Sequence, residues 1–364
     1  MKSKKLNPAL LLVAIASLTA GAASAQEYTV DGKVFGLPEA RVYTEDYQGP
    51  PAVGEYLSAL PNLKALNYTG NRTHQVRLDT FAQEVEIAPG KRYVAWTFGG
   101  SAPGPTLHVR EGDRIIFTMK NRSDEEVAIT PPLQNAFQKA TPSRAPMPHS
   151  MDFHSGTVAA SDKWRTIAPG QTIQFEWVAN YPGVYMYHCG TPSVLMHTAM
   201  GQYGAVVVSP KDGYATDGDV DHSYVMVQSE FYLAANPNGG VMRYDHAAAM
   251  ARTPSVVAFN GHVSAVHNEP LKANAGDRVR LYVLNAGPSG TSSFHVIGAI
   301  FDRIWYEGNP FNEMRGMQTV LLGASNGAVM EFIVPEEGSY KIVDHEFADA
   351  ERGASGTLKA GPRK

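Results

Sequence analysis

The chain of 364 residues carries a formal net charge of −4, from 31 basic and 35 acidic side chains. A mildly acidic protein has no electrostatic attraction for a phosphate backbone, so its composition argues against nucleic acid as a partner. Its 34 glycines, 24 prolines and 17 tyrosines favour many short strands and turns over helices.

The first 25 residues are expected to be a cleavable signal peptide. Lys2, Lys4 and Lys5 precede an apolar run over residues 10–20, and Ala23-Ser24-Ala25 is a small-x-small cleavage site. Because the apolar run is too short to span a bilayer, we expect export to the periplasm and no membrane anchor. Removal of the three lysines changes the net charge from −4 to −7, and the remaining length suffices for two domains of roughly 150 residues each.

The pattern along the chain is that of short strands. Residues 26–70 lack clear periodicity and are expected to form an ordered extension lying over a domain. Residues 130–148 are rich in proline and are expected to form a long loop. Two later runs, 174–178 and 183–187, flank a Tyr181-Pro182-Gly183 turn and are predicted to pair as a hairpin. The strands predicted before the loop cover residues 73–80, 93–98, 105–110 and 114–117.

The second half of the chain repeats the first. The segment Pro105–Arg114, with its Glu-Gly-Asp turn, is echoed by Pro270–Arg278, with an Ala-Gly-Asp turn. Two copies at a period of about 150 residues indicate a duplicated β-sandwich rather than a solenoid. The sequence therefore predicts an all-β protein with two tandem Greek-key β-sandwich domains, residues 71–212 and 213–364.

Cys189 is the only cysteine of the chain. In an exported protein it has no disulfide partner within its own molecule, so it is either a free thiol or a metal thiolate. His149 and His197 are nearby imidazoles, and Gln202 or Met200 could supply a weak axial ligand. One thiolate, two imidazoles and a weak axial ligand form the set that holds a blue-copper electron-transfer centre.

Strand geometry separates this group from a second one. Successive side chains of a strand point to opposite faces, so His188 must face away from the side that Cys189 faces. His149 and His154 are five residues apart and also face opposite sides in extended chain, with Asp152 on the side of His154. The sequence therefore predicts two sites, one around Cys189 and one around His188, joined by the short covalent path between these neighbours.

The second copy lacks the thiolate. Counting from the glycine that both copies share, Cys189 corresponds to Asp344. His345 stands directly after this position, whereas His188 stands directly before Cys189. We expect His345 to face out of its own domain, where it is available to the edge of a neighbouring domain.

Together these residues resemble the copper-containing nitrite reductases, two-domain cupredoxins of the multicopper oxidase superfamily. The resemblance covers nearly all of the chain after residue 25 and implies a cupredoxin-like fold for both sandwiches. It also implies a homotrimer with two coppers per subunit, one of type 1 and one of type 2. The motifs that carry it are Pro148-His149-x2-Asp152-Phe153-His154, Tyr187-His188-Cys189, His197, Phe294-His295-Val296-Ile297-Gly298 and Asp344-His345.

Carried over position by position, the resemblance implies six metal ligands and three further site residues. The ligands are His149, Cys189 and His197 for type 1 copper, and His154 and His188 of one subunit with His345 of its neighbour for type 2 copper. The active-site acid and base positions of the family fall on Asp152 and His295, and its steric apolar residue above the type 2 copper falls on Ile297.

One position departs from the family. The axial methionine of the family lies five residues after the second type 1 histidine, where this chain has Gln202, while Met200 stands two residues early. An amide oxygen is a harder and stronger donor than a thioether. Gln202 is therefore expected to stabilise Cu(II) and to lower the type 1 potential.

The resemblance implies one-electron reduction of nitrite to nitric oxide, with a small periplasmic cytochrome c or cupredoxin as electron donor. A laccase-like oxidase would need His-x-His pairs, which neither 148–154 nor 294–298 contains. An electron carrier or copper-binding protein with a vestigial type 2 site is the other alternative, and it would bind one copper per chain. The other histidines are expected to be structural: His74, His108, His222, His246, His262 and His267.

Overall fold

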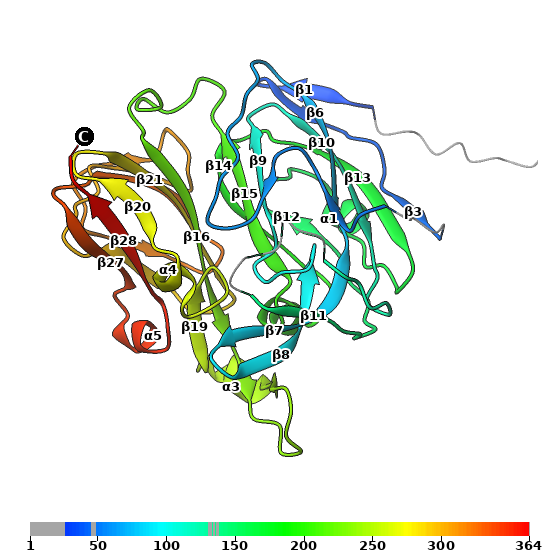
Figure 1. Cartoon of the computed structure of the whole chain (residues 1–364). Helices are drawn as coiled ribbons and strands as arrows, with labels where there is room; N and C mark the ends of the chain where they lie inside the picture. Colours follow the sequence, from blue (N-terminus) through cyan, green and yellow to red (C-terminus); the bar gives the residue numbers. More distant parts are fainter. Residues whose placement is uncertain (1–25, 45–48, 130–132, 134, 136–137, 364) are drawn as a thin grey trace, which may run out of the picture.

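The computed structural model describes residues 26–44, 49–129, 133, 135 and 138–363. The expected signal peptide lies outside these residues. The described chain forms two β-sandwiches that lie beside each other, the first on the right of Figure 1 and the second on the left. The prediction of an all-β fold is thereby confirmed. Within the described residues, no helix is long and apolar enough to cross a membrane.

Two five-stranded sheets form the first sandwich, and a three-stranded sheet joins its end. The sheet β3-β13-β10-β6-β4 comprises Arg41–Tyr43, Thr172–Val178, Arg114–Lys120, Thr73–Leu78 and Ala52–Val53 in that order. The sheet β12-β14-β15-β9-β5 comprises Asp152–Phe153, Gly183–His188, Tyr203–Ser209, Thr106–Arg110 and Leu57–Ser58. The third sheet, β11-β7-β8, comprises Ala140–Pro142, Thr80–Ala88 and Lys91–Phe98.

The second sandwich packs a six-stranded sheet against a five-stranded one. The sheet β19-β16-β21-β26-β23-β24 comprises Val256–Phe259, His222–Phe231, Arg278–Gly287, Gly327–Ile333, Arg303–Tyr306 and Glu313–Met314. The sheet β20-β28-β27-β22-β25 comprises Leu271–Asn274, Ser355–Gly361, Gly338–Asp344, Ser292–Val296 and Thr319–Leu322.

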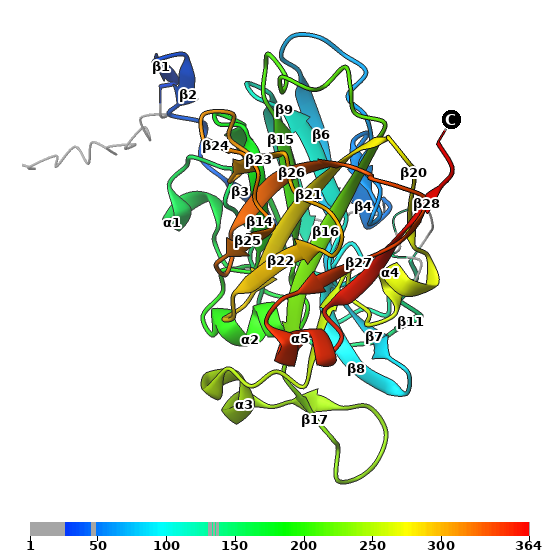
Figure 2. The same ribbon diagram turned by 90° about the vertical axis from the view of Figure 1, so that its left-hand side faces the viewer.

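Short elements complete the described chain. Figure 2 shows β17 and α3 projecting from the body beyond α2 and β8. The two-stranded pairs are β1 (Tyr28–Val30) with β2 (Lys33–Phe35) and β17 (Leu233–Ala234) with β18 (Arg243–Tyr244). The helices are α1 (Ala160–Lys163), α2 (Val194–Ala199), α3 (His246–Ala251), α4 (Ala265–Asn268) and α5 (Phe347–Glu351).

The predicted hairpin over residues 174–187 is wrong. Strand β13 pairs with β10 and β3, whereas β14 pairs with β12 and β15 in the opposite sheet. The turn at Tyr181-Pro182-Gly183 therefore carries the chain from one sheet of the sandwich to the other. Alternation of apolar residues reports a half-buried strand but does not say which sheet the strand joins. Part of the expected loop over residues 130–148 is also a strand, because β11 pairs with β7.

The N-terminal extension is built into the first sandwich. Strand β3 pairs with β13, β4 with β6, and β5 with β9, so three short strands add to the edges of the two five-stranded sheets. Buried hydrogen bonds fix the segment that follows. The Nδ1 of His108 donates to the carbonyl of Lys64 at 2.6 Å, and the hydroxyl of Tyr68 donates to the carboxylate of Asp113.

Equivalent hydrogen bonds mark the duplication. Asp113 accepts from the backbone N–H of Arg110, and its counterpart Asp277 accepts from the N–H of Asn274, at 2.8 and 2.7 Å. Each carboxylate also lies 2.9 Å from a histidine Nε2, His74 in the first sandwich and His222 in the second. These two histidines have structural partners, as the sequence predicts.

Strand β14 lies between two apolar cores. Tyr187 and Cys189 belong to the core inside the first sandwich, with Phe117, Phe153 and Trp177. Val184 and Met186 point the other way and pack against Val227, Tyr282 and Val329 of the second sandwich. His188 follows on this outer side, since side chains alternate along a strand. The register of β14 therefore places consecutive side chains in different environments.

Candidate metal centres

The first donor group gathers side chains from three parts of the first sandwich. Cys189 directly follows β14, His197 lies in α2, and His149 is held by two backbone hydrogen bonds with Ile167, at 2.8 and 3.0 Å. The Nδ1 of His197 lies 3.3 Å from the Nδ1 of His149 and 3.3 Å from the Sγ of Cys189. All three residues are at most 1% exposed.

These distances fit a shared metal ion. Metal–nitrogen bonds of about 2.0 Å and a metal–sulfur bond of about 2.3 Å place three ligand atoms roughly 3.5 Å apart around one ion. The donor atoms of His149, Cys189 and His197 all lie within 4.8 Å of one another. Buried polar groups that converge in this way suit a metal ion, because an ion compensates for the loss of their hydration in a low-dielectric interior.

The thiol of Cys189 is poised as a thiolate. Burial alone would raise its pKa, but hydrogen bonds from His149 and His197 outweigh burial and lower the pKa to about 5. Burial lowers the pKa of His149. Burial also acts to lower that of His197, but its hydrogen bond to Cys189 prevails and raises it. A thiolate is the form of cysteine that binds metals.

Gln202 places its side-chain amide next to the first donor group. Its Oε1 lies 3.0 Å from the Nδ1 of His197, and its Nε2 donates to the hydroxyl of Thr80 at 2.7 Å. The backbone of Gln202 pairs with that of Cys189, whose N–H donates to its carbonyl at 3.2 Å. Met200, the alternative, packs in an apolar cluster with Tyr93. The amide oxygen of Gln202 is therefore directed at the donor group.

Three residues around this group were not found from the sequence. Trp96 covers both imidazoles, with its ring centroid 4.9 Å from that of His197 and 5.6 Å from that of His149. Ser150 donates its backbone N–H to the Sγ of Cys189 at 3.4 Å. Thr80 and Trp96 belong to strands far from the ligands in sequence, so no local spacing signals them, whereas Ser150 directly follows His149.

The second donor group lies on the outer side of β14. Asp152 pairs with His188 in the register of β12 and β14. The Nε2 atoms of His154 and His188 lie 2.9 Å apart, and the Nε2 of His188 lies 3.8 Å from an Oδ2 of Asp152. His188 donates its Nδ1–H to the carbonyl of Cys189 at 2.9 Å, which leaves its Nε2 free to bind a metal.

One polar atom in this second group lacks a partner among the described residues. The Oδ1 of Asp152 is buried and accepts no hydrogen bond from them. Burial raises the pKa of Asp152, although the nearby His188 opposes the rise. Burial and the neighbouring His188 lower the pKa of His154 to about 4. Two imidazoles and a carboxyl group within 4.8 Å of one another are a donor set that suits a divalent transition metal.

The remaining predicted residues lie on the second sandwich. His345 is exposed directly after β27, and its ring centroid lies 5.2 Å from that of His295. His295 donates its Nδ1–H to the carbonyl of Gln318, and Ile297 is 46% exposed. Within the described residues, the donor group of Asp152, His154 and His188 includes neither His295 nor His345. The structure thus brings the predicted residues together as two groups on the first sandwich and a third on the second.

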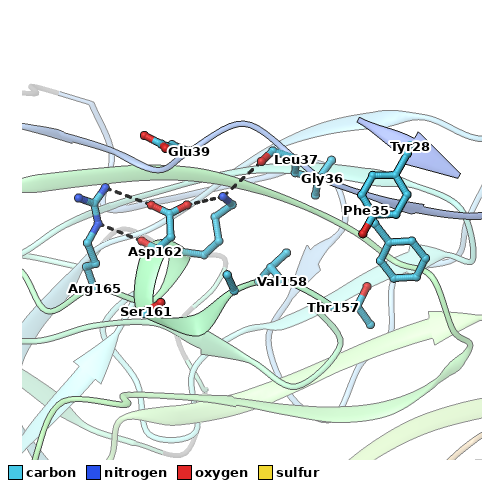
Figure 3. Close-up of a pocket in the computed structure, with 12 residues that line it drawn as sticks. Tyr28, Phe35, Gly36, Leu37, Glu39, Thr157, Val158, Ser161, Asp162 and Arg165 are labelled. Carbon is cyan, nitrogen blue, oxygen red and sulfur yellow. Dashed lines mark hydrogen bonds and ion pairs between the residues drawn. The ribbon is translucent and has the colours of Figure 1, made fainter. Parts of the chain in front are cut away.

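A cavity elsewhere has no connection with these groups. It measures about 630 Å³ and lies between β1, β2 and α1, with Tyr28, Phe35 and Lys163 in its wall (Figure 3). Asp162 bonds the ammonium of Lys163 and the backbone N–H of Ala40 there. Among the described residues, no histidine and no cysteine lines this cavity. A smaller cavity of about 290 Å³ does reach His188.

The fold and the two donor groups define a two-domain cupredoxin of the multicopper oxidase superfamily. Residues 81–142 match the multicopper oxidase family. A copper-containing nitrite reductase of Neisseria meningitidis is 38% identical over 290 residues, which cover 78% of this chain and 69% of that protein. The structure of the copper nitrite reductase of Nitrosomonas europaea superposes with a TM-score of 0.66 at 35% identity, over 80% of this chain and 94% of that one.

A copper-containing nitrite reductase of Thermus scotoductus gives a TM-score of 0.67 at 32% identity, over 80% of this chain and 62% of that one. The chain therefore belongs to the copper-containing nitrite reductase family. It is an oxidoreductase that uses copper, as the resemblance in its sequence implies.

Proposed function

We propose that the protein reduces nitrite to nitric oxide in the periplasm, as a homotrimer with one type 1 and one type 2 copper per subunit. His149, Cys189, His197 and the axial Gln202 would hold the type 1 ion. His154 and His188 would hold the type 2 ion together with His345 of a neighbouring subunit. The observation that carries this proposal is that two metal-donor groups meet at consecutive residues, His188 at the end of β14 and Cys189 directly after it.

The reaction is NO2⁻ + 2H⁺ + e⁻ → NO + H2O. Copper would supply a Lewis acid for nitrite and a one-electron couple for its reduction. The protein must then deliver two protons to one oxygen of nitrite. Asp152 and His295 are the proposed sources, because the Oδ1 of Asp152 has no partner among the residues that the structure describes, and a raised pKa favours its protonated form. The carbonyl of Gln318 holds the ring of His295 in one orientation.

The path for the electron is the backbone between Cys189 and His188. The carbonyl of Cys189 also accepts the Nδ1–H of His188, which adds a second link between the two side chains. A small periplasmic cytochrome c or cupredoxin is the proposed donor. Trp96 packs against His197, and Cys189 is buried, so water is excluded from the electron-accepting site.

An incomplete ligand set supports the proposed trimer, because it calls for a ligand from another copy of the chain. His154 and His188 supply two imidazoles, and an exposed His345 on the second sandwich is available to another copy of the chain. Ile297, exposed near His295, would then limit the space above the ion. Export to the periplasm rests on the signal sequence over residues 1–25, which lies outside the described residues.

Copper counting and electron paramagnetic resonance with and without nitrite test the proposal. We expect two coppers per chain, a type 2 signal that changes on adding nitrite, and nitric oxide when a reduced donor is present. A single copper per chain with no response to nitrite would instead identify an electron carrier. A monomer in solution with a full type 2 signal would contradict the role of His345 between subunits.

A further inference from the structure

Gln202 has a two-ended side chain, and its two ends have different partners. The Oε1 lies 3.0 Å from the Nδ1 of His197, on the side of the donor group. The Nε2 donates to the hydroxyl of Thr80 at 2.7 Å. Only the oxygen of an amide has a lone pair available to a metal, because that of the nitrogen is delocalised. Which end faces the donor group therefore decides whether Gln202 can act as an axial ligand.

Thr80 is a fixed acceptor for the amide. It is fully buried at the start of β7, where it pairs with Phe98 of β8. Its carbonyl accepts the N–H of Arg122 at 2.8 Å, which ties β7 to the segment after β10. Because the backbone of Thr80 is hydrogen-bonded on both sides and its side chain is buried, the hydroxyl has little freedom to move. A reversed amide would place an N–H among the metal donors and lose the contact of its oxygen with them.

We propose that Thr80 is a positioning residue for the type 1 site, holding the amide of Gln202 with its oxygen toward the metal. This inference rests on the proposed assignment of Gln202 as the axial ligand. A methionine at position 202 would need no such partner, since a thioether donates no hydrogen bond. The hydroxyl of Thr80 is therefore needed only when position 202 is glutamine rather than the family's methionine.

Two substitutions of Thr80 separate the hydroxyl from the shape of the side chain. Thr80→Val keeps the branched shape and removes the acceptor, whereas Thr80→Ser keeps the acceptor. In copper-loaded full-length protein we expect Thr80→Val to raise the type 1 midpoint potential in voltammetry and to change the type 1 resonance spectrum. Thr80→Ser should retain the wild-type potential and spectrum. Thr80→Ala, measured alongside, provides the same loss of the acceptor without a second methyl.

Thr97 offers a matched control. It is equally buried, lies on the neighbouring strand β8, and donates its hydroxyl to the carbonyl of Phe81 at 2.7 Å. Thr97→Val therefore removes a buried hydroxyl without touching Gln202 and should leave the type 1 potential unchanged. An equal shift in Thr97→Val and Thr80→Val would mean that the shift reports general loosening of the domain, and would overturn the inference.

A double-substitution cycle with Gln202→Met completes the test. In the Gln202→Met background, Thr80→Val should have no further effect on the potential, because the thioether does not bond the hydroxyl. A wild-type potential in both Thr80→Val and Thr80→Ala would overturn the positioning role. If Gln202→Met itself left the potential unchanged, the axial assignment would fail instead, so the two failures are distinguishable.

Discussion

The two sandwiches have the same backbone arrangement, but they carry different side chains at the position of Cys189 and Asp344. In the first, the N–H of Cys189 donates to the carbonyl of Gln202, and in the second the N–H of Asp344 donates to that of Ala354. The correspondence of Cys189 with Asp344, counted from a shared glycine, thus agrees with the strand pairing. One copy carries a thiolate and an amide at these positions, and the other a carboxylate and a methyl group.

The carboxylate of Asp344 accepts hydrogen bonds from the protein, whereas the Sγ of Cys189 lies among the candidate metal donors His149 and His197. Its carboxylate accepts from the Nε2 of Gln228 at 2.6 Å, from the N–H of Ser293 at 2.9 Å and from the N–H of Glu346 at 3.0 Å. Buried polar groups need partners, and the two copies meet this need in different ways. The comparison teaches that the backbone arrangement itself does not specify a metal site, since a few side chains decide it.

The proposed proton donors also stand at equivalent positions. Asp152 pairs with His188, the residue before Cys189, and His295 pairs with Val343, the residue before Asp344. His154 donates its N–H to the carbonyl of Met186, as Ile297 does to that of Lys341. The same edge of each copy thus supplies one acid–base residue. His154, a proposed type 2 ligand on the first copy, corresponds to the apolar Ile297 on the second.

Placing the second copy's residue in the first should have the largest effect. Cys189→Asp is expected to abolish the thiolate absorption band and to lower donor-driven nitrite reduction by more than about 100-fold, because it removes a ligand rather than one of its supports. Visible absorption and a donor-coupled assay measure both effects. A surviving blue band would show that Cys189 is not a ligand.

Removing the exposed histidine of the second copy should empty only the other site. His345→Ala is expected to lose the type 2 resonance signal and nitrite reduction while keeping the type 1 absorption band. His246→Ala, which removes another exposed histidine, is the control. Simultaneous loss of both copper signals would contradict the assignment of His345 to type 2 alone.

Changing one of the two equivalent acid–base positions should slow the reaction without removing copper. Asp152→Asn is expected to lower kcat by roughly 10²–10⁴-fold, the range for a lost proton donor. Metal analysis should still give the wild-type copper content, and the exposed Asp124→Asn provides the control. A kcat close to that of the wild type would exclude Asp152 from proton delivery.

A smaller effect distinguishes the copies in their response to pH. Leu107 and Leu271 hold equivalent places beside β15 and β28, and they are followed by buried His108 and exposed Lys272. Burial lowers the pKa of His108 from 6.5 to about 4. As pH falls, His108 is therefore protonated in the unfolded chain at a higher pH than in the folded protein. His108 should cost folding stability progressively from pH 6.5 down to pH 4, on the order of 3 kcal/mol in full.

His108→Asn keeps a donor for the carbonyl of Lys64 and removes the titration. The variant should lose less stability than the wild type between pH 6.5 and pH 4, as measured by urea unfolding of the copper-free protein. Parallel pH profiles for the two proteins would mean that His108 is protonated in the folded state as readily as in the unfolded one.

Much of the candidate site was predictable because its signal is local. The period of two along a strand was enough to expect Cys189 and His188 on opposite sides, and the structure separates them in that way. Thr80 and Trp96 escaped prediction because tertiary packing brings them from strands that lie far in sequence from all the proposed ligands. The failed hairpin has the same origin, since β13 and β14 are each half-buried but belong to different sheets.

The apolar seam on the outer face of β14 has a consequence for any attempt to shorten the protein. Val184, Met186 and Val207 are buried in a cluster that they share with residues of the second sandwich. An excised first half would retain every proposed type 1 ligand yet expose these apolar side chains to water, a feature that promotes aggregation. The second sandwich, which carries none of the proposed type 1 ligands, would thus be needed to keep the first sandwich soluble, and minimal blue-copper fragments of this chain would require redesign of these apolar positions.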